Sequence, residues 1–139
     1  MIDAHCHLQD EAFGEDIEQI IKTAIKQGVT RFVVNGTTES DWQIVAELAA
    51  DYREVIPSFG LHPWYIKERS SKWLDLLNTY LQQYPQSAVG EIGLDRWIRD
   101  HEISQQLEVF EAQWRLAVEL DRPITVHCLR AWGHLDASL

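Results

Sequence analysis

The sequence predicts a parallel α/β fold, and three observations support this fold class. Short apolar, β-branched runs alternate along the chain with amphipathic stretches, which is the order of βα units. Two of the runs, 32–34 and 124–126, are nearly continuously apolar, as is typical of parallel strands covered on both faces. Polar residues, histidine above all, follow the runs at their carboxyl ends. The alternation fits a doubly wound sheet and a β/α barrel, and the positions of the polar residues favour the barrel.

The apolar runs give the expected strands, which cover 1–7, 30–35, 55–60, 87–91 and 123–127. The amphipathic segments predict helices over 15–27, 42–52, 70–84 and 103–120, and a last helical segment begins after the fifth strand. Gly28 ends the first helix, and Ser40 with Asp41 is expected to cap the second. The side chains of the second helix expected to point inward are those of Ile44, Ala46, Leu48 and Ala49.

Length and composition indicate one globular domain over 1–139. The chain has 139 residues, of which 45% are hydrophobic and 24% charged. No apolar run approaches the ~20 residues that cross a bilayer, and the N-terminus lacks the basic and apolar regions of a signal peptide. We therefore expect a cytoplasmic location, no membrane partner, and reduced thiols at Cys6 and Cys128.

The formal net charge is −10, which disfavours binding of a polyanion through a broad basic surface. If the substrate is a nucleic acid, positive charge has to be concentrated at the site. Bound metal ions would supply it, since they are often the largest local charges.

His5 and His7 form the sharpest candidate site. Residues two apart in a strand share one face, with ~6.6 Å between their Cα atoms. Both imidazoles can then reach one metal ion at ~2.0–2.1 Å. The alternative is that both are ordinary surface histidines near a terminus. The polar residues at the other strand ends favour the metal site over this alternative.

Glu91 and His127 stand at equivalent ends of the fourth and fifth strands. Glu91 lies in an apolar, glycine-rich stretch, where a carboxylate is costly unless it is paired or coordinated. We predict that it binds a metal ion or bridges two, a salt bridge to Arg or Lys being the alternative. His127 directly follows an apolar run. It is a candidate ligand because His5, His7 and Glu91 stand at the other strand ends.

Two further residues are candidates for substrate binding. His62 precedes Pro63 and is expected in a loop, where it suits a phosphate contact better than metal binding. Arg130 could clamp a phosphate oxygen, although an ordinary surface arginine fits equally well. Both cysteines are interpreted as small core residues and not as ligands.

Four stretches together resemble the TatD-type metal-dependent deoxyribonucleases, within the wider amidohydrolase-like barrels. They are IDAHCHL at 2–8, GLHP at 60–63, GEIGLD at 90–95 and PITVHCLRA at 123–131. Each is weak singly, but four in register make a specific signal.

The resemblance implies a TIM-type barrel, with about five of its eight βα units present here, and hydrolysis of phosphodiester bonds with two divalent metal ions, whether Mg, Mn or Zn. It implies an exonuclease-like DNase with DNA as substrate. His5 and His7 would hold one ion, Glu91 would bridge as the catalytic carboxylate, and His127 would hold the second. His62 and Arg130 would lie near the phosphate.

The resemblance also implies three further βα units, which bring another His ligand and a late Asp. Because a TIM barrel typically needs ~250 residues, we expect this chain to be a fragment, truncated at its C-terminus. Five strands would leave open edges that favour self-association. Two other functions stay open: a C–N or phosphotriester hydrolase of the same superfamily, and a non-catalytic, metal-binding or self-associating half-barrel.

Overall fold

The computed structural model describes residues 1–99 and 102–138. Within them, parallel strands form one sheet in the order β1-β2-β3-β4-β5. The strands are β1 (Ile2–Cys6), β2 (Arg31–Asn35), β3 (Val55–Phe59), β4 (Ala88–Asp95) and β5 (Ile124–Leu129). Each strand adds beside the one before it, as in a β/α barrel, whereas the strand order of a doubly wound sheet reverses. The predicted partial barrel is therefore confirmed.

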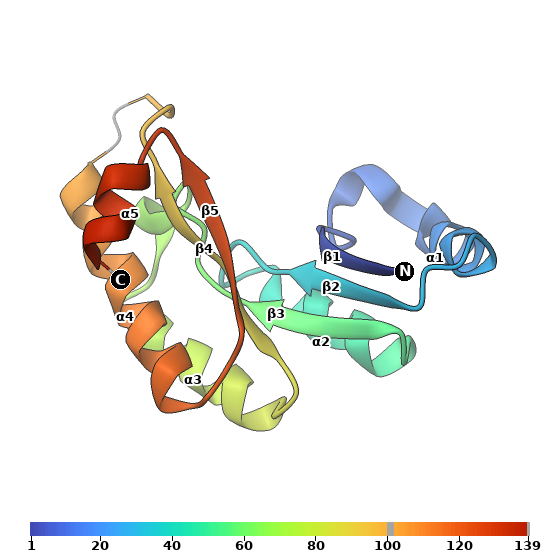
Figure 1. Cartoon of the computed structure of the whole chain (residues 1–139). Coiled ribbons are helices and arrows are strands. Elements are labelled where there is room, and N and C mark those ends of the chain that lie inside the picture. The colour runs from blue at the N-terminus through green and yellow to red at the C-terminus, as the bar shows by residue number, and fades with distance from the viewer. Residues whose placement is uncertain (100–101, 139) are drawn as a thin grey trace.

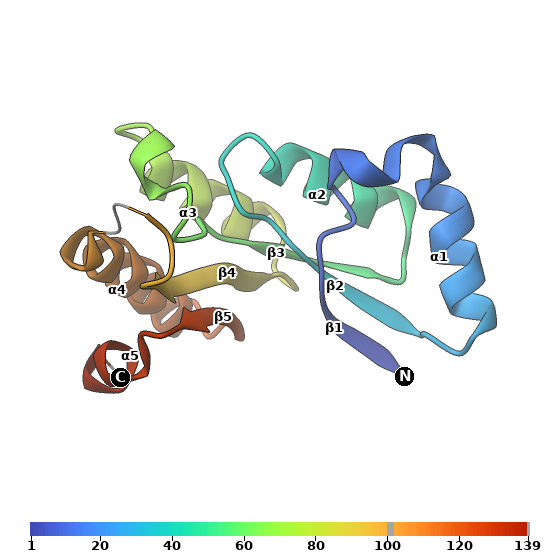
Figure 2. The ribbon, with the colours of Figure 1, turned by 90° about the horizontal axis from the view of Figure 1, so that it is seen from above.

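The helices cover one face of this curved sheet. They are α1 (Ile17–Lys26), α2 (Trp42–Asp51), α3 (Trp73–Gln83), α4 (Ile103–Glu119) and α5 (Trp132–Ser138), with short 3-10 helices η1 (Glu11–Asp16) and η2 (Ile66–Glu68). Figure 1 shows the sheet twisting from β1 to β5. Seen from above, the helices follow an arc outside the strands (Figure 2). In the part of the chain that the structure describes, no helix is long and apolar enough to cross a membrane.

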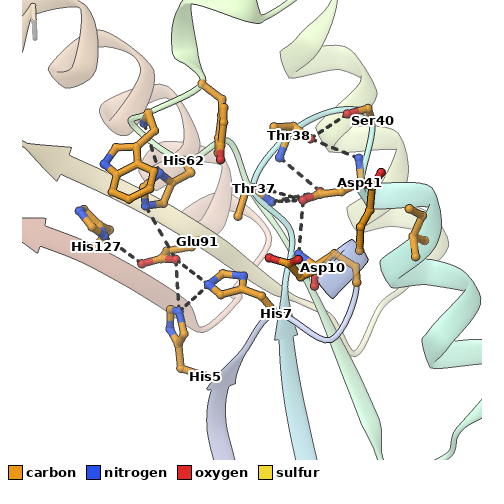
Figure 3. A pocket seen from close by; sticks show the side chains of 15 residues that line it. His5, His7, Asp10, Thr37, Thr38, Ser40, Asp41, His62, Glu91 and His127 are labelled. Atoms are coloured by element: carbon orange, nitrogen blue, oxygen red, sulfur yellow. Dashed lines mark hydrogen bonds and ion pairs between the residues drawn. The ribbon is translucent and has the colours of Figure 1, made fainter. Parts of the chain in front are cut away.

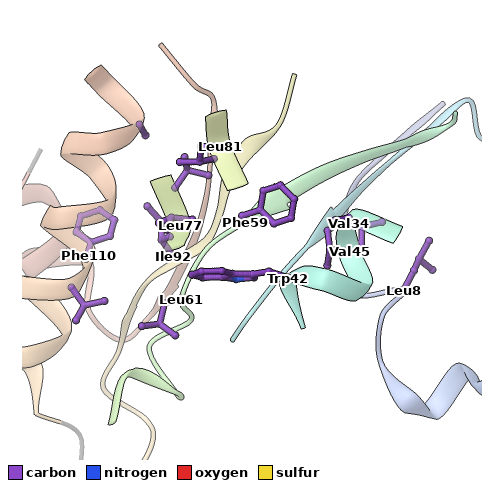
Figure 4. Close-up of a cluster of buried hydrophobic side chains, with 14 of the residues drawn as sticks. Leu8, Val34, Trp42, Val45, Phe59, Leu61, Leu77, Leu81, Ile92 and Phe110 are labelled. Atoms are coloured by element: carbon purple, nitrogen blue, oxygen red, sulfur yellow. The ribbon is translucent and has the colours of Figure 1, made fainter. Parts of the chain in front are cut away.

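The hydrophobic core lies between the sheet and these helices (Figure 4). Trp42 at the start of α2 is fully buried, and its indole N–H donates to the carbonyl oxygen of Gly60 at 2.9 Å. Phe59 from β3 and Leu77 from α3 are also fully buried. The core thus fastens the helices to the carboxyl ends of the strands, where the polar residues gather.

Two predictions for the second helix need correction. Ile44 does not point inward: its exposed fraction is 43%, and Trp42 and Val45 take the buried face of α2. Asp41 does not cap α2 through its side chain. Its carboxylate accepts hydrogen bonds from the backbone N–H groups of Thr37 and Thr38 instead.

The fourth strand is longer than predicted. It continues through Asp95, so Glu91 lies inside β4 and not at its end. Every residue of β4 is buried. Gly90 and Gly93, which interrupt the apolar run in the sequence, sit within the strand. The glycines therefore signal close backbone packing and not a turn.

Candidate metal centre

Glu91 lies at the centre of a group of histidines that come from different strands (Figure 3). His5 comes from β1, and His7 follows the end of β1 by one residue. His62 lies in the loop between β3 and η2, and His127 lies on β5. Parallel strands bring their carboxyl ends to one rim, which is why residues so far apart in sequence meet here.

The first set of donors is compact. The Nε2 atoms of His5 and His7 lie 3.1 Å apart, and they lie 3.2 and 3.3 Å from Oε2 of Glu91. A tetrahedral ion with bonds of ~2.0–2.1 Å separates its ligand atoms by ~3.3 Å. The spacing of these three atoms therefore fits a single transition-metal ion.

The protonation of His7 also suits metal binding. Its Nδ1 lies 2.8 Å from the carbonyl oxygen of Asn35, which can only accept a hydrogen bond. The proton of the neutral ring therefore sits on Nδ1, and Nε2 keeps a lone pair that faces Glu91. A backbone acceptor behind the ring is the usual support for a metal-binding histidine.

The second set of donors is formed by His62, Glu91 and His127. Nδ1 of His127 lies 3.2 Å from Oε1 of Glu91, and Nε2 of His62 lies 3.9 Å from Oε2. The backbone N–H of Trp64 donates to Nδ1 of His62 at 3.2 Å. In a neutral ring the proton then sits on Nε2, so this tautomer of His62 acts as a hydrogen-bond donor toward the site.

Asp95 supports His127 from the other side. Its Oδ2 lies 3.0 Å from Nε2 of His127 and accepts the indole N–H of Trp64 at 2.6 Å. Asp95 is fully buried. A carboxylate that holds Nε2–H of a histidine leaves Nδ1 free for a metal ion. The sequence pattern alone gives Asp95 no role, although Asp95 stands four residues after Glu91 on the same strand.

These contacts set the charge states of the site. A hydrogen bond to Glu91 is the main cause that raises the pKa of both His7 and His127 above its ordinary value. Burial tends to raise the pKa of Glu91, but hydrogen bonds from His127 and His7 keep it well below its ordinary value. Burial lowers the pKa of His62 to about 4. Glu91 is thus a carboxylate and His62 a neutral ring at neutral pH.

Gly93 sets the distance between β4 and β5 beside the site. It pairs with His127 in the register of the two strands and has a φ of +151°. A Cβ at this position would lie 1.9 Å from the carbonyl oxygen of His127. No side chain fits there, so Gly93 allows His127 to approach Glu91.

A pocket of about 850 Å³ opens in front of these donors. His5, His7, His62, Glu91 and His127 line one side, and residues that follow β1 and β2 line the other. Trp64, whose exposed fraction is 52%, stands at the edge. The pocket is wide enough for a ligand much larger than a metal ion.

The sequence of this chain matches the family model described as TatD related DNase over residues 2–139. The chain belongs to the TatD-related DNase family. This confirms the predicted resemblance, and the four short stretches that carried it all fall inside the match.

Individual TatD-type relatives agree with this membership. The uncharacterized metal-dependent hydrolase YjjV of Escherichia coli is 33% identical over 99% of this chain and 54% of its own length. The 3'-5' ssDNA/RNA exonuclease TatD of Pantoea vagans is 33% identical over 100% of this chain and 54% of its own. The crystal structure of YjjV matches with a TM-score of 0.91 at 31% identity, over 99% of this chain and 56% of that one. The chain thus spans about half the length of these TatD-type relatives.

Within this TatD-type fold, His5, His7, Glu91 and His127 come together, as expected from the sequence. Arg130 takes a different place: its guanidinium stacks over the ring of Trp97 at 3.6 Å. Cys6 and Cys128 are free thiols that pack against the core. The residues able to bind a metal ion are thus histidines and a carboxylate, and relatives in the same family are named as metal-dependent hydrolases.

Proposed function

We propose that this chain carries the metal-binding half of a nuclease, a hydrolase that cleaves phosphodiester bonds of DNA with two divalent metal ions. The observation that carries the proposal is the sharing of Glu91 between two sets of imidazoles at one strand rim. A carboxylate has two oxygens: Oε2 of Glu91 lies 3.2, 3.3 and 3.9 Å from His5, His7 and His62, and Oε1 lies 3.2 Å from His127. This arrangement suits a bridging ligand between two ions.

In this proposal, His5, His7 and Glu91 hold the first ion, and Glu91 with His127 holds part of the second. Such ions lower the pKa of a bound water and stabilise charge on phosphoryl oxygens. Imidazole and carboxylate donors suit Zn²⁺ or Mn²⁺ better than Mg²⁺. Glu91 is the catalytic carboxylate because it touches both groups of donors.

His62 contributes a different chemistry. Its Nδ1 accepts the backbone N–H of Trp64, which leaves Nε2–H to donate into the pocket. A neutral donor beside the ions can bind a non-bridging phosphate oxygen without competing for metal. Arg130 stays a candidate for a second phosphate contact, provided that its guanidinium can reach substrate from its place on Trp97.

A nucleic-acid substrate is supported by the names of the relatives. Several are 3'-5' ssDNA/RNA exonucleases, and one from Danio rerio carries the name deoxyribonuclease. With a net charge of −10, the chain depends on the ions for attraction to a polyanion. We further propose that 1–139 forms a single, incomplete barrel domain, and that the two free thiols fit a cytoplasmic location.

The experiment joins residues 1–139 to the C-terminal part of YjjV that has no counterpart here. We expect this hybrid to degrade single-stranded DNA in the presence of Mn²⁺ and to stop when EDTA is added. Glu91→Gln should lower the rate by at least ~100-fold, the scale for a group that acts on the transition state. Glu18→Gln, on the exposed face of α1, is the matched control and should retain the rate. Equal rates for the two variants would contradict the proposal.

A further inference from the structure

Helix α4 carries two glutamines that are completely buried. The exposed fraction is 1% for Gln106 and 0% for Gln113. Their neighbours on this helix face include the buried Val109, Phe110 and Ala117. A buried side-chain amide has to find partners for both its N–H₂ and its oxygen, so these two positions are chemically unlike the rest of the stripe.

Each glutamine uses its side-chain amide to pair with the backbone of one residue. Oε1 of Gln113 accepts the N–H of Leu61 at 2.7 Å, and its Nε2 donates to the carbonyl oxygen of Leu61 at 3.2 Å. Oε1 of Gln106 accepts the N–H of Asp95 at 2.7 Å, and its Nε2 donates to the carbonyl oxygen of Asp95 at 2.8 Å. Each amide therefore satisfies both the N–H and the C=O of one backbone residue, as a neighbouring strand does in a sheet.

The two clamped residues stand next to the candidate metal centre. Leu61 directly precedes His62, whose Nε2 faces Glu91. Asp95 ends β4, and its carboxylate holds His127. Leu61 lies beyond the end of β3, and Asp95 is the last residue of β4, where its register partner is Leu129 of β5. At both points the glutamine side chain, and not a further strand, bonds the N–H and C=O groups of the residue.

One helix controls both points at a fixed spacing. Gln106 and Gln113 are seven residues apart, so they lie on the same face of α4, two turns from each other. The helix α4 thus sets the distance between the backbone of Leu61, next to His62, and the backbone of Asp95, which holds His127.

We propose that Gln106 and Gln113 are positioning residues, which place the rings of His127 and His62 against Glu91 by pairing with the backbone of Asp95 and Leu61. What the rings do there rests on the proposed function, but the positioning itself does not. Each glutamine binds the N–H and the C=O of one backbone residue. A side chain that lacks either a donor or an acceptor therefore cannot replace the glutamine amide.

The test uses the whole 139-residue chain without metal. Gln106→Leu, Gln113→Leu and the control Gln105→Leu are compared by NMR of the histidine ring nitrogens and carbons. Gln105 lies beside Gln106 but pairs with Glu102 at the surface. We expect Gln106→Leu to shift the His127 resonances, Gln113→Leu to shift those of His62, and the control to shift neither. His5 and His7 should stay unchanged throughout.

Two results would overturn the proposal. One is unchanged His127 and His62 resonances in folded variants, and the other is an equal shift of all four histidines, which indicates general loosening. If a variant does not fold, amide hydrogen exchange in the unaltered chain decides. The N–H groups of Leu61 and Asp95 should exchange as slowly as those inside β4, and exchange as fast as in exposed loops contradicts the clamp.

A Mn²⁺ titration separates this proposal from the proposed function. We expect Gln106→Leu to bind Mn²⁺ at least ~10-fold more weakly than Gln105→Leu, the usual loss when the support of a ligand is removed. Equal affinities would overturn the positioning role. If the unaltered chain binds no metal at all, the proposed function fails, and the ring resonances still report on the positioning.

Discussion

Glu91 is a buried carboxylate surrounded by imidazoles and without a lysine or arginine partner among the residues that the structure describes. A charge in such a place is costly unless neighbours compensate it. In the metal-free chain, hydrogen bonds with His7 and His127 do so, which raises the pKa of both rings and keeps that of Glu91 below its ordinary value. The negative charge of Glu91 is therefore in place before any ion arrives, and an ion that binds would displace ring protons that face Glu91.

Glu91→Gln tests this account of the charges. The substitution keeps the shape of the side chain but removes its charge, so the pKa of His7 and of His127 should fall toward the ordinary value of 6.5. NMR titration of the metal-free chain measures both values. The exposed variant Glu18→Gln should leave them in place. Raised pKa values that persist in Glu91→Gln would show that another group causes them.

The histidine pair of β1 gives the second prediction at this scale. His5→Ala combined with His7→Ala removes two of the three atoms that fit one ion. Affinity for Zn²⁺ or Mn²⁺ should fall by more than the ~10–100-fold that is typical for losing an outer partner of a ligand. Calorimetric titration measures the loss, with His134→Ala on α5 as the control. Full metal content in the double variant would refute the assignment.

The elements show which parts of the site could be predicted from the sequence. The strand rim was predictable because apolar runs end in His5, His7 and His127, and parallel strands align their ends. The roles of Asp95 and Gln106 were not, since each depends on a contact between different elements: Asp95 binds the side chain of His127, and Gln106 binds the backbone of Asp95. A polar residue inside the apolar stripe of α4 was the one available signal.

Helix α2 shows why periodicity alone misjudged a buried face. Trp42 and Val45 are buried, whereas Ile44 is 43% exposed. The buried face differs from the predicted one because Trp42 stands at the first position of the helix. There it packs against Gly36 and donates a hydrogen bond to the carbonyl oxygen of Gly60. The largest side chain, and not the average of the stripe, fixes the orientation.

This difference can be measured as stability. Trp42→Ala should lower the free energy of unfolding by about 3–5 kcal/mol, the usual cost of deleting a buried aromatic side chain. Ile44→Ala on the same helix should cost less than about 1 kcal/mol, because Ile44 is 43% exposed and lies outside the core. Urea denaturation followed by circular dichroism compares the two. Similar losses would place Ile44 in the core after all.

At the scale of the whole molecule, the sheet has two edges. Within residues 1–99 and 102–138, β1 pairs with β2 alone and β5 pairs with β4 alone. Met1, Ile2 and Leu129 expose much of their apolar surface near these edges. Unpaired strand edges with apolar side chains favour association with other chains. The same fold that gathers the metal donors therefore also predicts self-association.

We expect the 139-residue chain to form dimers or larger species at micromolar concentration, whereas the hybrid with the C-terminal part of YjjV stays monomeric. Sedimentation velocity distinguishes the two. Ile2→Lys should weaken association by placing charge on the β1 edge, and Ile25→Lys, at a partly exposed site on α1, is the matched control. A monomeric chain at all concentrations would contradict the prediction.

The seam between β4 and β5 has a consequence for how this sequence can change over time. At Gly93 the neighbouring carbonyl occupies the space of a methyl group. Any mutation in that codon that alters the amino acid would push away the strand that carries His127. Gene variants that retain the chemistry should therefore show only silent changes there, even where the surrounding surface drifts freely.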